Sequence, residues 1–164
     1  CNDPVMYIDD RWLYDQEDEL PPVVELDLAT QRPEISVIGS DVTIVASGHA
    51  SLLAREAEKL LKCENISAEV IDVRVLNPFH AEEIIESVKK TKNLLVVDSG
   101  WISGGFSAEV IAKVVEQLPV DCLSNPPVRV ALPDAPAPTS RVLEKAYYTS
   151  TDDVVKAVKK ILNS

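Results

Sequence analysis

The hydrophobic pattern between residues 41 and 74 changes its period twice. Val42 to Ala46 is a continuous β-favouring apolar run, which is typical of a strand covered on both faces. From Ala50 to Lys62 the apolar residues recur at helical spacing and predict an amphipathic helix. Ala68 to Val73 is again a short apolar run and predicts a second strand. A strand, a helix and a strand of this length form a right-handed βαβ unit with parallel strands.

The same alternation continues to the end of the chain. It predicts a helix that begins after Pro78, a strand at 93–98, a loop at 99–105 and a helix at 106–118 with Val115 on its inward face. A strand at 128–132 and a short helix at 142–147 follow. The last helix is predicted to start at Ser150, with a capping box to Asp153. Four buried strands alternating with helices indicate an α/β fold. We expect a three-layer α/β/α sandwich with a mostly parallel sheet.

The first forty residues differ from the rest in charge and composition. They contain ten acidic residues and two arginines, and prolines stiffen the stretch that contains Pro21, Pro22 and Pro33. We therefore divide the chain into residues 1–14, the end of a preceding domain in which Val5 to Ile8 form a short strand, an acidic proline-containing linker at 15–34, and a folded domain at 35–164. The start at Cys1, without a methionine, fits a piece of a longer polypeptide. The alternative is an N-terminal arm that lies across its own domain.

Length, net charge and cysteine spacing exclude several classes of function. A chain of 164 residues with 46% hydrophobic residues buries one full core. The net charge of -11 disfavours nucleic acids and anionic membranes as partners and suits a basic protein. No apolar run reaches the ~18 residues that a membrane span needs. Cys1, Cys63 and Cys122 are too far apart for a metal motif, and we expect reduced thiols in a cytoplasmic protein.

Two loops precede helices and could carry chemistry. Ser47-Gly48-His49-Ala50-Ser51 has one glycine, whereas dinucleotide binding needs three, so we expect a tight turn with Ser47 or Ser51 capping the helix. His49 and His80 are each interpreted as surface or packing residues.

The second loop is Ser103-Gly104-Gly105-Phe106. Its paired glycines permit a positive φ and a close approach of another backbone. It is either a strand-to-helix turn with Phe106 as the first core residue or an interface loop. No HExxH, GxSxG or GKS/T string occurs, so the residues indicate a folded domain without a catalytic constellation of its own.

A resemblance to a known family extends from Val5 to the end. The chain resembles the C-terminal part of the β subunit of thiamine-diphosphate-dependent 2-oxoacid dehydrogenases, of the pyruvate or branched-chain type, within the transketolase C-terminal family. The matching strings, in the family's order and spacing, are PVMYIDDRWLY, DVTIVASG, ISAEVIDVRVLNP, VKKTKNLLVVDSG, SGGFSAEV and the stretch from Val128 through Pro138 to LEKAYY.

The resemblance implies an assembly role. In the family, the pyrimidine of the cofactor is bound by the preceding domain of the β subunit, and residues 1–14 would be the last part of that domain. The diphosphate and its magnesium are held by a Gly-Asp-Gly motif on the α subunit, which this chain lacks. The implied partners are the α subunit and a second β subunit in a heterotetramer, and the basic binding domain of the acyltransferase core. We expect no cofactor in this chain alone, and the candidate interface residues are Trp12, Tyr14, Trp101, Gly104, Gly105 and Phe106.

One string departs from the pattern. Many members carry His-Glu-Ala-Pro where this chain has Asp98-Ser99-Gly100-Trp101, which leaves the subfamily and the 2-oxo acid open. A transketolase or deoxyxylulose-phosphate synthase could contain a similar segment. A free-standing flavodoxin-like binding module would have the same layers.

Overall fold

The computed structural model describes residues 3–17, 19, 22 and 24–163, so Cys1 and Pro21 of the sequence interpretation lie outside the described residues. The strands are β1 (Glu34–Val37), β2 (Val42–Ala46), β3 (Ala68–Asp72), β4 (Leu94–Trp101) and β5 (Val128–Leu132). The helices are α1 (His49–Lys62), α2 (Glu82–Thr91), α3 (Phe106–Gln117), α4 (Arg141–Tyr147) and α5 (Thr151–Leu162), with short 3-10 turns η1 (Arg11–Leu13) and η2 (Leu28–Thr30).

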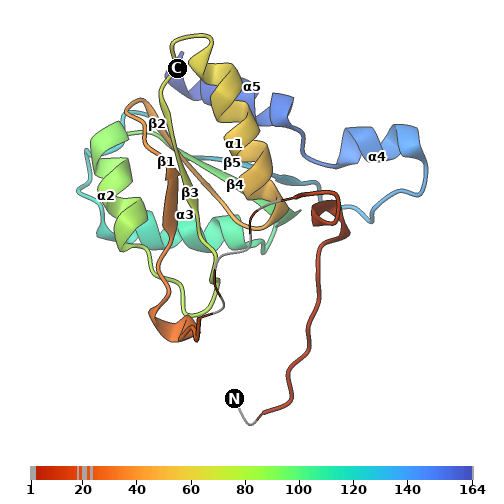
Figure 1. The fold of residues 1–164 in the computed structure, drawn as a ribbon. Helices are drawn as coiled ribbons and strands as arrows, with labels where there is room; N and C mark the ends of the chain where they lie inside the picture. The colour runs from red at the N-terminus through yellow and green to blue at the C-terminus, as the bar shows by residue number, and fades with distance from the viewer. Residues whose placement is uncertain (1–2, 18, 20–21, 23, 164) are drawn as a thin grey trace.

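The described residues form the predicted three layers around a sheet in the order β1-β3-β2-β4-β5 (Figure 1). Strands β3, β2, β4 and β5 run parallel, and only β1 is antiparallel to its neighbour. Helices α1 and α5 pack on one face of the sheet through a core that includes Ala54, Leu61 and Val158. Helices α2 and α3 pack on the other face, around Ile84 and Val114. The α/β sandwich with a mostly parallel sheet is therefore confirmed.

Strand β1 has no counterpart among the predicted strands. It begins at Glu34, the last residue of the predicted linker, and pairs antiparallel with β3 at the edge of the sheet. The turn that follows brings Gly39 against β3, where a Cβ on Gly39 would lie 2.2 Å from the carbonyl carbon of Ala68. Glycine is required there because only a residue without a Cβ permits this approach.

The helix predictions hold in outline and fail at single positions. The capping box of α5 is confirmed, with Ser150 and Asp153 bonding reciprocally. The strand predicted at 93–98 continues to Trp101, because Trp101 resumes pairing with Leu132 after a register shift, so the predicted loop is shorter. The inward placement of Val115 is wrong, since its side chain is 44% exposed.

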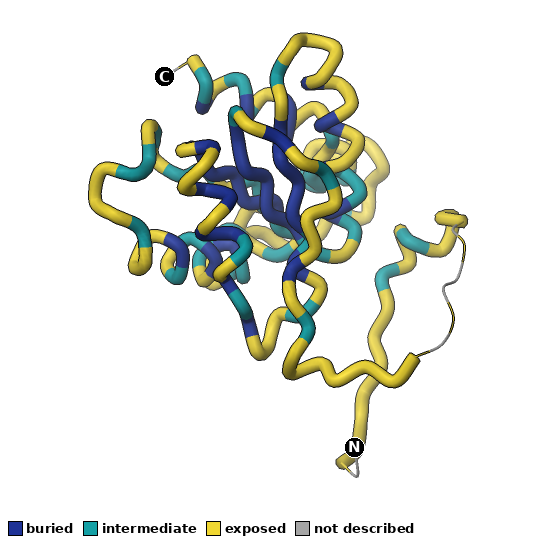
Figure 2. The backbone as a smooth tube through the Cα atoms, turned by 60° about the vertical axis from the view of Figure 1, so that its left-hand side comes forward, coloured by how far each residue is buried: buried dark blue, intermediate teal, exposed yellow. Residues whose placement is uncertain are grey.

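The N-terminal arm leaves the globular body in Figure 1, and Figure 2 colours it as exposed along most of its length. The predicted strand at Val5 to Ile8 is wrong in this structure, because these residues pair with no strand in the described part of the arm and each is at least 78% exposed. Further along the arm, η1 returns to the body. Whether residues 1–14, 15–34 and 35–164 are separate units stays a prediction.

Candidate functional site

The carboxyl ends of the parallel strands meet at one edge of the sheet. The chain leaves β2 toward β3 on one side and later returns to β4 on the other side of β2. The direction of winding therefore reverses between β2 and β4. In open α/β sheets, ligands bind at the carboxyl edge beside this reversal, so a site is expected near the turns that follow β2 and β4.

The turn after β2 is tight and leads directly into α1. Gly48 has φ 56° and ψ -132°, a conformation that residues with a side chain rarely adopt. The prediction that Ser47 or Ser51 caps this helix is wrong, because α1 has no side-chain cap. The Ser51 hydroxyl is buried and has no hydrogen-bond partner among the described residues.

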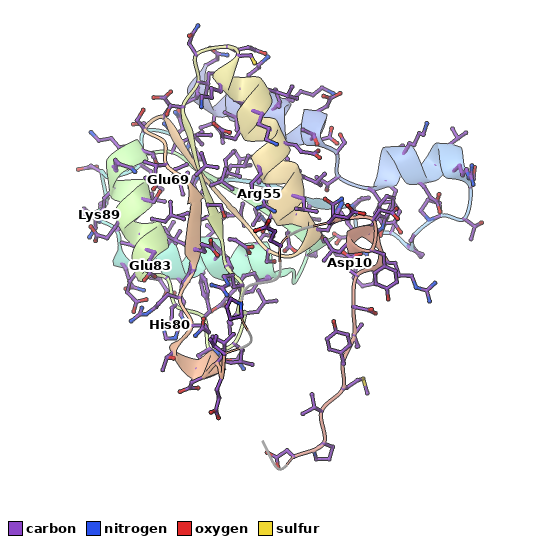
Figure 3. All side chains as sticks on the ribbon, in the orientation of Figure 1. Asp10, Arg55, Glu69, His80, Glu83 and Lys89 are labelled. Atoms are coloured by element: carbon purple, nitrogen blue, oxygen red, sulfur yellow. The ribbon has the colours of Figure 1, made fainter. Side chains whose placement is uncertain are left out.

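Trp12 occupies the space in front of this turn. Asp10 fixes η1 by accepting a hydrogen bond from the Trp12 backbone N–H at 3.0 Å. The centroid of the Trp12 ring lies 5.6 Å from that of His49 and 5.8 Å from that of Tyr148. Asp10, the residue before η1, is labelled in Figure 3 near the N-terminal end of α1. The arm therefore lies on the domain at the edge where a ligand would be expected.

A cavity of about 250 Å³ remains beneath the arm. Its lining comes from η1, from the start of α1, from the ends of β4 and β5 and from the segment before α5: Asp10, Trp12, His49, Leu53, Ser99, Leu132, Tyr148 and Thr149. Apolar and aromatic surface dominates. Trp12, a candidate interface residue, and His49, interpreted as a surface or packing residue, are thus brought together.

Tyr14 does not join this cluster. Its side chain is 64% exposed. Its hydroxyl donates a hydrogen bond to the Asp9 carboxylate, and this bond raises the pKa of Tyr14 above its ordinary value, with a smaller contribution from desolvation.

The turn after β4 is organised by Asp98. The Asp98 carboxylate accepts hydrogen bonds from the backbone N–H of Gly100 at 2.8 Å and of Ser107 at 2.7 Å. Ser107 lies in the first turn of α3, so an internal carboxylate occupies the positive end of that helix. A phosphate group bound at the N-terminus of α3 would compete with Asp98 for the Ser107 N–H.

The two glycines of this loop have separate roles. Gly104 has φ 70°, as the sequence predicted for one of them. A Cβ on Gly105 would lie 2.2 Å from the Trp101 carbonyl oxygen, so the predicted close approach of backbone is confirmed. Phe106 packs edge-to-face on Phe79 with ring centroids 5.2 Å apart and serves as a core residue of its own domain. An interface role for the loop stays a prediction.

Trp101 points away from the loop and toward α4. Its indole N–H donates to the Tyr147 hydroxyl at 3.0 Å, and that hydroxyl donates to the Ala135 carbonyl oxygen at 2.8 Å. The Trp101 side chain is 56% exposed although it is held in place. Tyr147 was not singled out from the sequence, and nothing local in its surroundings marks it.

His80 and the linker meet on the other side of the domain. A ring nitrogen of His80 lies 2.9 Å from the Ala29 carbonyl oxygen and hydrogen-bonds to it. Arg32 pairs with Glu82 at 2.6 Å. The two histidines therefore hold different parts of the N-terminal segment and do not form a common site.

The most buried charge of the domain lies far from the cavity, on β3 (Figure 3). Glu69 is 1% exposed and accepts hydrogen bonds from the Gly39 N–H at 3.1 Å and from Lys90 on α2. Burial alone would raise the pKa of Glu69. The hydrogen bonds from Lys90, Ser87 and Gly39, together with the charge of Lys90, outweigh burial and lower that pKa. We interpret this pair as structural.

Over the described ranges, no group of three His, Cys, Asp or Glu side chains is placed to hold a metal ion. Across the same residues, no helix has the length and apolar composition of a membrane span. Cys63 is exposed and Cys122 is half-buried, and both are free thiols.

Comparison with known families matches residues 32–154 to the C-terminal domain of transketolase. The chain belongs to the transketolase C-terminal domain family. The match includes the whole sheet and every helix up to the start of α5, so the resemblance inferred from the sequence is confirmed.

Full-length relatives of this transketolase C-terminal domain are β subunits. The chain is 37% identical to pyruvate dehydrogenase E1 component subunit beta, mitochondrial, of Caenorhabditis elegans, over 99% of the chain and 47% of the relative. It is also 37% identical to pyruvate dehydrogenase E1 component subunit beta of Rickettsia felis, over 98% of the chain and 48% of the relative. The chain thus spans about half the length of the curated relatives that it matches.

A solved structure shares the fold. It is described as a split gene transketolase, an inactive beta4 tetramer, and it superposes with a TM-score of 0.73 at 31% identity over 90% of this chain and 46% of that one. All of these similarities lie with the pyruvate type or with transketolase. The string Asp98-Ser99-Gly100-Trp101 is therefore compatible with similarity to pyruvate dehydrogenase β subunits.

Proposed function

We propose that this chain is the assembly half of a β subunit of a thiamine-diphosphate-dependent 2-oxoacid dehydrogenase of the pyruvate type. In the full enzyme, a 2-oxo acid is decarboxylated oxidatively and its acyl group passes to a lipoyl group. The names of the relatives, of which the chain covers 47% and 48%, and the match to the transketolase C-terminal domain support this assignment. The contribution of this chain is to hold subunits together.

The observation that carries the proposal is how the carboxyl edge of the sheet is used. Trp12 covers the turn before α1, and the Asp98 carboxylate accepts the Ser107 N–H in the first turn of α3. The chain's own groups therefore fill the positions at which α/β domains commonly receive a phosphorylated ligand. Such a domain is suited to binding proteins through its outer surfaces.

Thiamine diphosphate and magnesium belong to the full enzyme in this proposal. The described residues do not fit a magnesium diphosphate, because they bring no three acidic, histidine or cysteine side chains together. We therefore derive no catalytic step for this chain. That the isolated chain does not bind the cofactor stays a prediction, and so does its place in the cytoplasm, since the Caenorhabditis elegans relative is named as mitochondrial.

The proposed partners follow from the relatives and from charge. They are the α subunit, a second β subunit and the basic binding domain of the acyltransferase core. The net charge of -11 favours the approach of a basic domain, because complementary charge speeds association more than it tightens a complex.

A chimera tests the proposal. The half of the Rickettsia felis subunit that this chain matches is replaced by the chain, and the chimera is produced together with the corresponding α subunit. Formation of a complex with pyruvate-dependent activity is expected, with the unmodified subunit as the positive control. A complex that never forms, while the chain by itself binds thiamine diphosphate or a flavin in a calorimeter, contradicts the assembly role.

Transketolase is the second candidate. The similarity to a split gene transketolase, at 31% identity over 90% of this chain, favours it. In this case the chimera made from the Rickettsia felis subunit stays inactive with pyruvate. A free-standing flavodoxin-like module is the third alternative, and tight flavin binding by the chain alone would favour it.

A further inference from the structure

The cavity beneath the arm lies where open α/β sheets receive ligands, beside the reversal of winding between β2 and β4. Its volume of about 250 Å³ is enough for a small organic molecule. The assembly function proposed above makes no use of this cavity. The chemistry of its lining therefore has to be considered separately.

Two aromatic rings meet at an angle in the wall of the cavity. Trp12 comes from the arm and Tyr148 from the segment before α5. Their ring centroids lie 5.8 Å apart, and their planes are inclined by 58°. Trp12 is 61% exposed, so much of its ring is free to contact a ligand. Rings at an angle attract one cation with both faces, as in the aromatic cages that bind quaternary ammonium groups.

A carboxylate lies beside these rings. Asp10 lines the same cavity, and its Oδ1 accepts the Trp12 backbone N–H at 3.0 Å, which fixes the carboxylate next to the Trp12 segment. Among the described residues, none that lines the cavity is a lysine or an arginine, and none of either type pairs with Asp10. A carboxylate without a cationic neighbour attracts a cation and repels a phosphate.

The aromatic wall is held in place before any ligand arrives. Tyr148 packs edge-to-face on Tyr147 with ring centroids 5.1 Å apart. Tyr147 in turn accepts a hydrogen bond from Trp101 and donates one to the Ala135 carbonyl oxygen. A preorganised ring loses little conformational entropy on binding, so more of the interaction energy is retained as affinity.

We propose that this cavity binds a small organic cation, a tertiary or quaternary ammonium compound, against the rings of Trp12 and Tyr148 and beside the Asp10 carboxylate. The inference goes beyond the proposed assembly function and does not depend on it. Asp10 and Trp12 belong to the arm, whereas Tyr148 belongs to the folded domain. A cation that contacts all three stabilises the docked position of the arm, because it binds only when the arm is in place.

Two ligands of the same shape test the proposal. Choline is the probe, and dimethylbutanol, its isostere with carbon in place of the charged nitrogen, is the control. Each is titrated into the full chain in a calorimeter at about 0.15 M sodium chloride, which screens general attraction to an acidic protein. We expect choline to bind with a dissociation constant of about 1 mM, and the isostere to bind at least about tenfold more weakly.

Neighbouring acids provide a matched pair of variants. Asp10→Asn keeps an oxygen that accepts the Trp12 N–H but removes the charge, so it should weaken choline binding about tenfold. Asp9→Asn removes the same charge from the preceding residue, which does not line the cavity, and should change the dissociation constant by less than about threefold. Tyr148→Leu removes one ring and should also weaken binding about tenfold. Circular dichroism checks that the variants are folded.

Hydrogen exchange locates the bound cation. Choline should slow amide exchange in η1 of the wild-type chain and leave exchange in α2 unchanged. Equal affinity for choline and its isostere would overturn the cation site, and so would equal effects of Asp9→Asn and Asp10→Asn. Absence of binding at choline concentrations far above the expected dissociation constant overturns it as well. The chimera decides on the assembly function separately, because its activity is measured without choline.

Discussion

Replacing Glu69 by Gln tests whether one buried carboxylate ties the edge of the sheet to α2. Glu69 lies on β3, and it accepts hydrogen bonds from Gly39, in the turn after β1, and from Lys90 on α2. Its side chain is 2% exposed, whereas that of Lys90 is 47% exposed. Three segments that are distant in the sequence therefore depend on one negative charge.

The expected cost follows from what Gln retains and loses. A Gln side chain still accepts the Gly39 N–H, but it offers no charge to Lys90. Breaking a fully buried ion pair costs about 3–5 kcal/mol, and Lys90 recovers part of this because it can turn to water, so we expect a loss of about 2 kcal/mol in the free energy of unfolding. Glu82→Gln is the matched control. Glu82 pairs with Arg32 but its side chain is 63% exposed, and its replacement should cost less than about 1 kcal/mol.

The pH dependence gives a second readout. In the folded chain, the pKa of Glu69 lies below its ordinary value of 4.5. A carboxyl group whose pKa is lowered by folding stabilises the fold above its unfolded pKa, and this stabilisation is lost as the pH falls through the folded value. The difference in the free energy of unfolding between the wild-type chain and Glu69→Gln should therefore be largest near neutral pH. It should shrink as the pH falls below the pKa that Glu69 has in the unfolded chain.

Urea unfolding followed by circular dichroism measures both effects. The reasoning is refuted if Glu69→Gln costs no more than Glu82→Gln at neutral pH. It is equally refuted if the difference from the wild-type chain persists unchanged in acid.

Two further substitutions test the arm and the glycine loop. Trp12→Ala removes the contacts with His49 and Tyr148. Amide hydrogen exchange in η1 should therefore accelerate, while exchange in the sheet stays unchanged. Exchange in η1 at the wild-type rate would show that this ring does not hold the arm. Gly105→Ala places a Cβ against the Trp101 carbonyl oxygen and should lower the free energy of unfolding by at least about 2 kcal/mol in urea titration. Gly104→Ala is its control, because no atom lies within 4 Å of the added Cβ. Only the positive φ is penalised there, at about 1 kcal/mol. Equal losses in the free energy of unfolding at both glycines would contradict the close approach at Gly105.

The main layers could be predicted because burial on two faces leaves a strong mark in a sequence. Val42 to Ala46 is buried at every position, and the helix that follows alternates between buried and exposed residues. Strand β1 has no such continuous run of apolar residues in its sequence. Its residues Glu34 to Ile35 are exposed, and its pairing is decided by the free edge of β3 and not by its own pattern.

Only part of the candidate site could be predicted from the sequence. Asp98 and Ser107 are close in sequence, and an acid between a strand and a glycine loop is a local signal for a helix N-terminus, although it was not used. The contacts of Trp12 with His49 and Tyr148 join distant parts of the chain, and no periodicity reports them. For the same reason Tyr147, which fixes Trp101, could be found only in three dimensions.

The exposed apolar side chains of the arm determine how much free energy the arm would gain if another surface covered them. Val5, Met6, Tyr7 and Ile8 are each at least 78% exposed, and burying four such side chains contributes roughly 6–12 kcal/mol, at about 1.5–3 kcal/mol each. Ordering four residues costs about 4–8 kcal/mol in backbone entropy alone. The arm alone therefore gives only a marginal attachment. A stable attachment through the arm would need a further contact whose ordering cost is smaller.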